Sequence, residues 1–155
     1  MTLAGGYREL DHPADIALEV WGDDLLDLLR SATCALLSVW LKPDGLEGIS
    51  RSSPRVEGRE SIEVVDEFDL LIQWLNRVLL APQLKLRLPH HVLDLDVRGG
   101  VEGDFLQAEI SYEALTLAKG SSEALWAREI KSVTYGGGLN RDPSGRYRAL
   151  LILDI

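Results

Sequence analysis

The chain has 155 residues, and its 25 acidic and 16 basic side chains give a formal net charge of −9. Proteins that hold nucleic acid by themselves usually carry a basic face, so this balance argues against strong direct RNA binding and suits a basic partner or a cation. No apolar stretch approaches the roughly 20 residues of a membrane-spanning helix, so no membrane association is expected. The length is typical of one domain, expected over residues 1–155, and no signal peptide is indicated, which makes the cytoplasm the expected location.

The first predicted elements are a strand and a helix. Residues 15–22 alternate between an apolar side and a mixed side, which predicts a strand that ends at Gly22. Apolar residues at helical spacing follow, and either Asp23 or Asp24 can cap this helix. The helix is expected to stop before Pro43, because proline cannot continue it.

A second helix is predicted after a less regular segment. Residues 44–60 are rich in Gly, Ser, Arg and Pro and predict a loop or a weak edge strand, followed by a short strand over residues 61–65. The second helix opens at Asp66 or Glu67, and its apolar stripe ends at Ala81-Pro82. Both helices are amphipathic enough to lie on a sheet.

The rest of the sequence is rich in strand patterns. Alternating apolar residues predict strands over residues 84–88, 93–97, 106–112, 115–117 and 129–135. Three glycines at 136–138 are expected to break the last of these, and residues 142–145 indicate a turn. Residues 146–155 are apolar on both faces in their latter half, as in a central strand. The sequence therefore predicts an α+β fold, a mixed or antiparallel sheet or sandwich with two main helices packed on it.

Two carboxylates and an imidazole lie close together at the start of the first predicted strand. Asp11, His12 and Asp15 fall within five positions, and short polar runs at strand ends often build functional sites. The same segment could instead form an Asx-type turn around Pro13, with His12 held by ordinary hydrogen bonds.

A second acidic feature ends the sequence. Asp154 and Ile155 follow directly on the apolar last strand. A hard divalent cation binds oxygen ligands, and Asp154 with the main-chain or terminal oxygens of Ile155 could supply several. Asp15 would join them if the first and last strands are neighbours, whereas an exposed acidic tail is the alternative.

Lys131 lies within the predicted strand over residues 129–135. Alternation places it on the same side as Val133 and Tyr135, toward an apolar face. A lysine in that position either extends its ammonium group outward to water or pairs with an acid.

Cys34 is the only cysteine, so no internal disulfide can form. Its neighbours Ala32, Ala35 and Leu36 predict a buried, inert thiol rather than a nucleophile. No cluster of histidine and cysteine predicts structural zinc.

Three segments together resemble the archease family. Leu10-Asp11-His12-Pro13-Ala14-Asp15-Ile16 is similar to its D-H-T-A-D opening, Glu129-Ile130-Lys131-Ser132-Val133-Thr134-Tyr135 to its E-V-K-A-I-T-Y signature, and Ile152-Leu153-Asp154-Ile155 to its closing D-I. Their order and separation fit, and the resemblance spans nearly the whole chain. Pro13 stands where threonine is usual, and Gly136 stands where histidine or another side chain is common.

The resemblance implies a metal-binding activator protein rather than an enzyme. Members of the family bind a divalent metal, typically calcium, through residues that match Asp15, Asp154 and Ile155. They use residues that match Asp15, Lys131 and Asp154 to stimulate an RtcB-type RNA ligase, promoting guanylylation of its catalytic histidine and multiple turnover in tRNA splicing or RNA repair. Asp11 and His12 could support the metal site from outside its direct ligands.

Two other functions remain open. A metal-dependent hydrolase could use His12, Asp15 and Asp154, but it would also need an open metal position, a base for water and a substrate pocket. Some members of the family have been linked to an RNA methyltransferase as chaperone-like modulators, a function that would need an exposed apolar patch.

Overall fold

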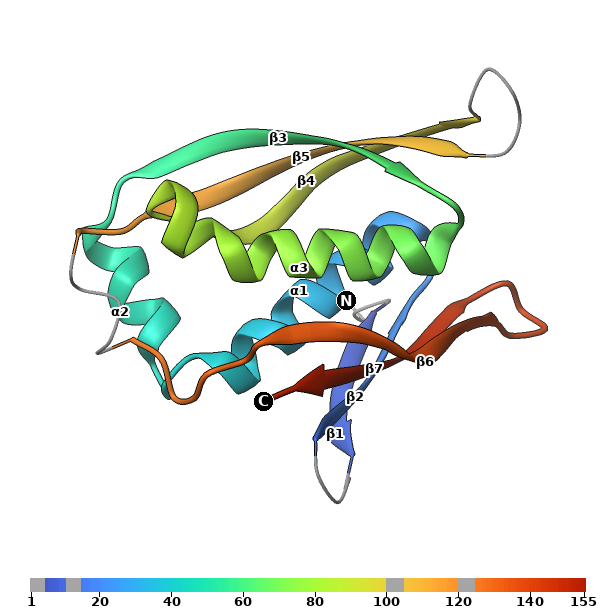
Figure 1. The fold of residues 1–155 in the computed structure, drawn as a ribbon, viewed down its shortest axis with the longest axis horizontal. Helices are drawn as coiled ribbons and strands as arrows, with labels where there is room; N and C mark the ends of the chain where they lie inside the picture. Colours follow the sequence, from blue (N-terminus) through green and yellow to red (C-terminus); the bar gives the residue numbers. More distant parts are fainter. Residues whose placement is uncertain (1–4, 11–14, 100–104, 120–124) are drawn as a thin grey trace.

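The fold consists of two antiparallel sheets with helices between them (Figure 1). The computed structural model describes residues 5–10, 15–99, 105–119 and 125–155. In chain order the elements are β1 (Gly6–Leu10), β2 (Ile16–Gly22), α1 (Leu25–Trp40), α2 (Gly45–Ser52), β3 (Arg55–Val64), α3 (Glu67–Lys85), β4 (Arg87–Gly99), β5 (Leu106–Thr116), β6 (Ser132–Arg141) and β7 (Tyr147–Asp154). The four-stranded sheet has the order β1-β2-β7-β6, and the three-stranded sheet has the order β3-β5-β4.

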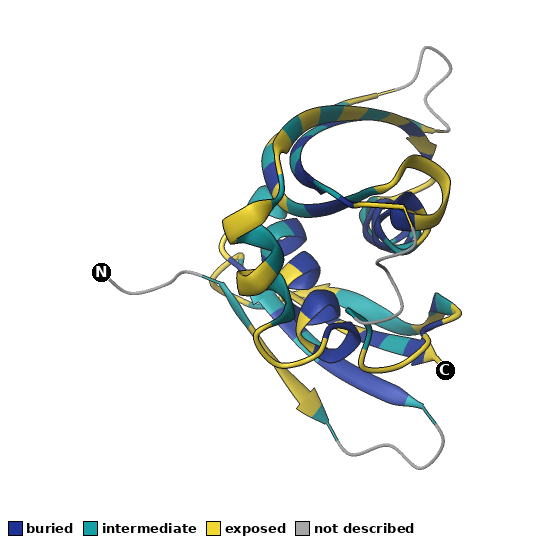
Figure 2. Cartoon of the chain, turned by 90° about the vertical axis from the view of Figure 1, so that its left-hand side faces the viewer, coloured by how far each residue is buried: buried dark blue, intermediate teal, exposed yellow. Residues whose placement is uncertain are grey.

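Helices α1 and α3 fill the space between the two sheets, and Figure 2 shows that their buried residues face both layers. Leu36 of α1, Leu71 of α3, Leu18 of β2 and Ile110 of β5 are fully buried members of one continuous core. Burial of these apolar side chains is the main stabilising contribution to such a layered fold. No helix in the described part of the chain is both long and apolar enough to cross a membrane.

The α+β prediction is confirmed, and so are several of its local signals. Asp24 caps α1 by accepting a hydrogen bond from the backbone N–H of Asp27 at 2.7 Å. Asp66 caps α3 in the same way, at 2.8 Å from the N–H of Asp69. The last strand lies between β2 and β6, as its two apolar faces predicted.

Strand β6 differs from its prediction, because it begins at Ser132 and continues through the three glycines. Its pairing with β7 shifts between Thr134 and Gly138, so residues 135–137 lie opposite a single position of β7. A Cβ atom at Gly137 would lie 1.8 Å from the carbonyl oxygen of Leu150. Glycine therefore permits the close approach of the two backbones at this bulge instead of ending the strand.

The other differences concern element boundaries. Residues 44–60 contain the short helix α2 and most of β3, and β1 was not predicted. Helix α3 continues through Pro82 to Lys85, so residues 84 and 85 are helical. Pro82 lies in the last turn of α3, so its missing backbone N–H and its ring disturb only the end of the helix. The proline ring is buried.

Cys34 is exposed, so the prediction of a buried thiol is wrong. Ser38, four residues later, is exposed as well, which places both residues on the face of α1 that points away from the core. The apolar neighbours of Cys34 in sequence lie on the opposite face, so adjacency in sequence gave the wrong environment.

Candidate functional site

The structure brings the beginning of β2 and the end of β7 together. The two strands are antiparallel neighbours, and Ile16 pairs with Leu153. Asp15 and Asp154 are the chain neighbours of this last pair, so the two residues lie near one another at the end of the two strands. Residues at the two ends of the sequence therefore lie side by side at one end of the four-stranded sheet.

The two carboxylates lie on the outer face of this sheet. Leu151 and Leu153 of β7 are buried against the helices, whereas Asp154 is exposed, as alternation along the strand requires. Asp15 is half-buried. Both groups therefore lie within reach of water.

The donor set at this sheet end fits a hard divalent cation. Two carboxylates and the terminal oxygens of Ile155 offer only oxygen, and calcium completes such a set with water. Within the described residues no group of three or more His, Cys, Asp and Glu side chains gathers around one point. A cation here would thus depend on Asp15, Asp154 and main-chain or terminal oxygens. Asp11 and His12 lie outside the described residues.

The segment that leads into β6 joins the same sheet end. Ser132 pairs with Asp154, and the backbone N–H of Lys131 donates to the carbonyl oxygen of Asp154 at 2.8 Å. Figure 1 shows the C-terminus beside the start of β6. The Lys131 side chain is exposed and makes no ion pair with any described carboxylate. Lys131 precedes β6 and its side chain is exposed to water, the first of the two expected outcomes.

Helix α3 anchors β6 beside the candidate site. The Asn76 side chain accepts from the N–H of Val133 at 2.9 Å and donates to its carbonyl oxygen at 2.9 Å. The amide thus pairs with Val133 much as another strand would, along an edge of the sheet that none of the described strands covers. Neither Asn76 nor Ser132 was singled out from the sequence, because the contact of Asn76 with Val133 and the pairing of Ser132 with Asp154 both depend on the tertiary structure.

Tyr135 provides a second link between β6 and α3. Its hydroxyl donates to the Asp69 carboxylate at 2.5 Å, and Asp69 also accepts from the Val65 N–H and the Gln73 amide, both at 3.0 Å. Burial alone would raise the pKa of Asp69, but these three hydrogen bonds outweigh it and hold the pKa below its usual value. Burial and the Asp69 carboxylate together raise the pKa of Tyr135 to about 12.

The fold and this arrangement define a class of small α+β proteins, in which two antiparallel sheets enclose two helices and acidic residues from both ends of the chain meet at one sheet end. The chain belongs to the archease family: the model of the archease protein family (MTH1598/TM1083) matches residues 7–155.

Individual relatives agree with this assignment. The archease of Methanopyrus kandleri is 26% identical over 153 residues, which cover 96% of this chain and 99% of that protein. The archease of Archaeoglobus fulgidus is 38% identical over 74 residues, covering 47% of this chain and about half, 49%, of that protein. The solution structure of Methanobacterium thermoautotrophicum protein 1598 has the same fold, with a TM-score of 0.68, 20% identity, and coverage of 99% of this chain and 100% of that one.

Proposed function

We propose that this protein is a metal-binding activator of an RtcB-type RNA ligase. In this proposal Asp15, Asp154 and Ile155 hold a divalent cation, most suitably calcium, and Asp15, Lys131 and Asp154 form the surface that acts on the ligase. The observation that supports the proposal is the strand register, in which Ile16 pairs with Leu153, the chain neighbours of Asp15 and Asp154, while the backbone N–H of Lys131 donates to the carbonyl oxygen of Asp154.

The chemistry of the site suits a supporting part in phosphoryl transfer. A bound divalent cation would neutralise negative charge on phosphate oxygens, and guanylylation depends mostly on such neutralisation and on positioning. The exposed Lys131 ammonium would add a second positive charge beside it. The net charge of −9 would favour approach to a basic, RNA-binding ligase and disfavour direct binding of RNA.

The direct test is guanylylation of a cognate ligase with GTP, in the presence and absence of this protein. We expect stimulation by the wild type, its loss in Asp15→Asn and Lys131→Ala, and its retention in Asp94→Asn. Asp94 is an exposed carboxylate on β4 of the other sheet, so its variant matches the charge change of Asp15→Asn.

Lys131→Ala separates activation from folding. An exposed lysine without an ion pair contributes little to stability, so the variant should unfold within about 0.5 kcal/mol of the wild type. It should also bind calcium normally, because an ammonium group cannot coordinate a cation. Full stimulation by Lys131→Ala would remove Lys131 from the active surface. Nucleotide or phosphodiester hydrolysis by the isolated protein, lost in Asp15→Asn, would favour a hydrolase instead.

A further inference from the structure

The free edges of the two sheets differ in how they are protected. An edge strand carries open backbone N–H and carbonyl groups, which can pair with a strand of another chain. Strand β1 is only five residues long, and Asn76 occupies the edge of β6 at Val133. On β4, Arg30 donates to the carbonyl oxygens of Val92 and Leu93, and the pairing with β5 shifts twice. Among the described strands, these features protect three of the four at the sheet edges.

Strand β3 forms the fourth edge and pairs with β5 in one continuous register (Figure 1). The Pro54 carbonyl accepts from the Thr116 N–H on the β5 side. Alternation therefore directs the even-numbered backbone groups of β3 to β5 and the odd-numbered ones to the free edge. The Gln73 amide donates to the Glu63 carbonyl at that edge, at 3.3 Å. Within the described part of the chain, the odd positions of residues 55–61 thus keep open backbone groups.

The exposed side chains of β3 are complementary to those of a second copy. Glu57 and Arg59 project from the outer face on either side of Gly58, and neither makes an ion pair or side-chain hydrogen bond with any described residue. In an antiparallel pair of β3 strands with Gly58 opposite Gly58, each Glu57 lies opposite Arg59 of the other copy. This register also pairs the odd-numbered backbone groups with one another over residues 55–61. Registers centred on Glu57 or Arg59 would set like charges opposite one another.

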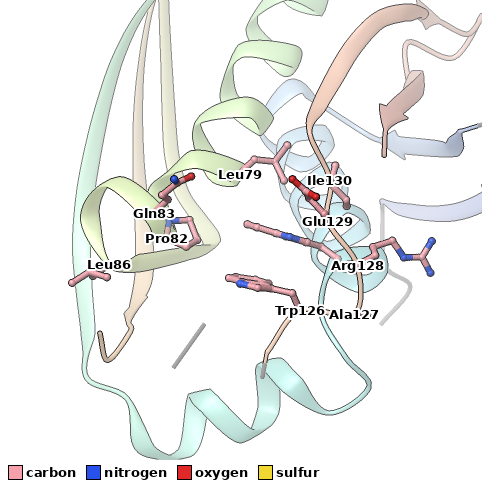
Figure 3. A pocket seen from close by; sticks show the side chains of 10 residues that line it. Leu79, Pro82, Gln83, Leu86, Trp126, Ala127, Arg128, Glu129 and Ile130 are labelled. Carbon is pink, nitrogen blue, oxygen red and sulfur yellow. The ribbon is translucent and has the colours of Figure 1, made fainter. Parts of the chain in front are cut away.

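The C-terminal half of α3 exposes two leucines beside the same edge. Leu80 is 51% exposed and Leu84 is 71% exposed, and both line a pocket of about 370 Å³ together with Glu60 of β3. Figure 3 shows another side of this helix end, where Leu79 and Pro82 line a separate pocket. Leu80 and Leu84 are one turn apart, so they form an apolar strip on the side of α3 that borders β3.

Ion pairs fix where this strip lies along β3. Glu60 binds Arg77 at 2.8 Å and Lys85 at 3.0 Å, and these two residues flank the exposed leucines in α3. Because Glu60 is two residues from Gly58, the leucines lie near the axis about which two β3 strands would pair. A twofold arrangement would bring the two α3 helices together and bury an apolar strip that a single chain leaves in water.

We infer that two copies of this chain pair through β3 in an antiparallel, twofold-symmetric dimer centred on Gly58. The Glu57 and Arg59 side chains form reciprocal ion pairs on its outer face, and the exposed leucines of α3 meet beneath it. The pairing joins the three-stranded sheets of both copies into one continuous sheet and satisfies the open backbone groups. It does not depend on the proposed function, because Asp15 and Asp154 lie at the end of the other sheet.

Sedimentation equilibrium over concentrations from about 1 μM to about 1 mM tests the pairing. The wild type should show a reversible equilibrium between monomer and dimer. Glu57→Arg and Arg59→Glu should each raise the dissociation constant about tenfold, because each sets like charges opposite one another in both reciprocal pairs. Glu63→Arg makes the same charge change on β3 outside the paired residues, and it should leave the dissociation constant unchanged.

Mixing the two charge variants separates loss of pairing from loss of folding. In an equimolar mixture, opposite charges meet again in both pairs when Glu57→Arg in one chain faces Arg59→Glu in the other. A heterodimer should therefore form with about the dissociation constant of the wild type. Leu84→Ser should also weaken the dimer of the wild type, whereas Leu150→Ser, which changes an exposed leucine of the other sheet, should not.

Hydrogen exchange identifies the edge that pairs. The amides of Glu57 and Arg59 should gain protection as the concentration rises, whereas the Gly58 amide, which faces β5, should be protected in the monomer as well. Sedimentation as a monomer at every concentration would overturn the inference. So would a dimer that neither charge variant weakens, or charge variants that weaken the dimer and fail to form a heterodimer when mixed.

Discussion

At the scale of single residues, the hydrogen bond from Tyr135 to Asp69 ties the beginning of β6 to the beginning of α3. The lowered pKa of Asp69 means that its ionised form is favoured by folding, so its contribution to stability is present above the ordinary aspartate pKa of 3.8 and is lost as the pH falls through the lower value of the folded state. The raised pKa of Tyr135 has the opposite sense. Its contribution is complete below pH 10 and is lost as the pH rises toward about 12.

Tyr135→Phe should therefore destabilise the protein near neutral pH, by about 1 kcal/mol once the exposure of Tyr135 is taken into account. The difference from the wild type should shrink as the pH falls below about 4, because a protonated Asp69 no longer accepts a charge-assisted hydrogen bond. Urea unfolding at a series of pH values measures both effects. A difference in unfolding free energy that stays constant at acid pH would show that Tyr135 contributes through packing and not through Asp69. Its packing partner is Phe68, whose ring lies edge-on with the two ring centroids 6.0 Å apart.

The proposed cation site could be anticipated at this scale only in part. Asp15 and Asp154 were recognisable from their motifs, and the strand pattern allowed them to meet. Asn76 carried no signal, because an asparagine in an amphipathic helix is ordinary. Ser132 lies in the motif itself, but its place beside Asp154 follows from a register that no local pattern contains.

At the scale of elements, α3 completes the open edge of β6 through Asn76. Without this amide, the N–H and carbonyl groups of Val133 would lose their partner in a partly buried position. Strand β6 is the one that carries Ser132 next to Asp154, so its position also determines where Lys131 lies.

Asn76→Ala should lower the free energy of unfolding by about 1–3 kcal/mol, because it leaves both groups of Val133 unpaired. Asn76→Asp should cost at least as much, since the carboxylate cannot donate to the carbonyl oxygens of Val133 and Ile72 that the amide contacts. Arg77→Ala, which removes only the surface ion pair with Glu60, is the neighbouring control and should cost less than about 1 kcal/mol.

Hydrogen exchange gives the corresponding local measurement. The Val133 amide should exchange faster in Asn76→Ala, by a larger factor than amides of the three-stranded sheet. Equal acceleration throughout the protein would mean that Asn76 stabilises the fold as a whole and does not specifically hold β6.

The elements also show where sequence patterns suffice. Helices α1 and α3 were predicted because caps and apolar spacing are local properties, and both caps are present in the structure. The predicted break at the glycines of β6 was wrong, because those residues serve a backbone approach to Leu150 that depends on a distant strand. Strand β1 escaped notice for a related reason: it is short, and its pairing with β2 defines it.

At the scale of the whole molecule, the fold joins the two ends of the chain. β2 and β7 are central neighbours in the four-stranded sheet, so residues separated by nearly the whole sequence form one surface. The core of this sheet is built from Leu18, Val20, Leu151 and Leu153, which lie on the face opposite to Asp15 and Asp154. The proposed site therefore lies on strands whose opposite face is buried, and none of its own side chains belongs to the core.

This separation predicts that the fold survives loss of the site. In chelator, the melting temperature of Asp15→Asn should be close to that of the wild type. The substitution changes a half-buried side chain at the end of a sheet, outside the core. With calcium at about 100 times its dissociation constant, the wild type should gain about 2.7 kcal/mol while the variant gains much less. A collapse of folding in Asp15→Asn, even in chelator, would instead show that Asp15 is chiefly a structural turn residue.

The measurement that tests the proposed site most directly is calorimetric titration of calcium into the purified protein and its variants. We expect one ion per chain, with binding weakened at least about tenfold in Asp15→Asn and in Asp154→Asn and unchanged in Asp94→Asn. Addition of one alanine after Ile155 should also weaken binding if its terminal carboxylate is a ligand. Equal calcium affinity in the wild type, Asp15→Asn and Asp154→Asn would contradict the site.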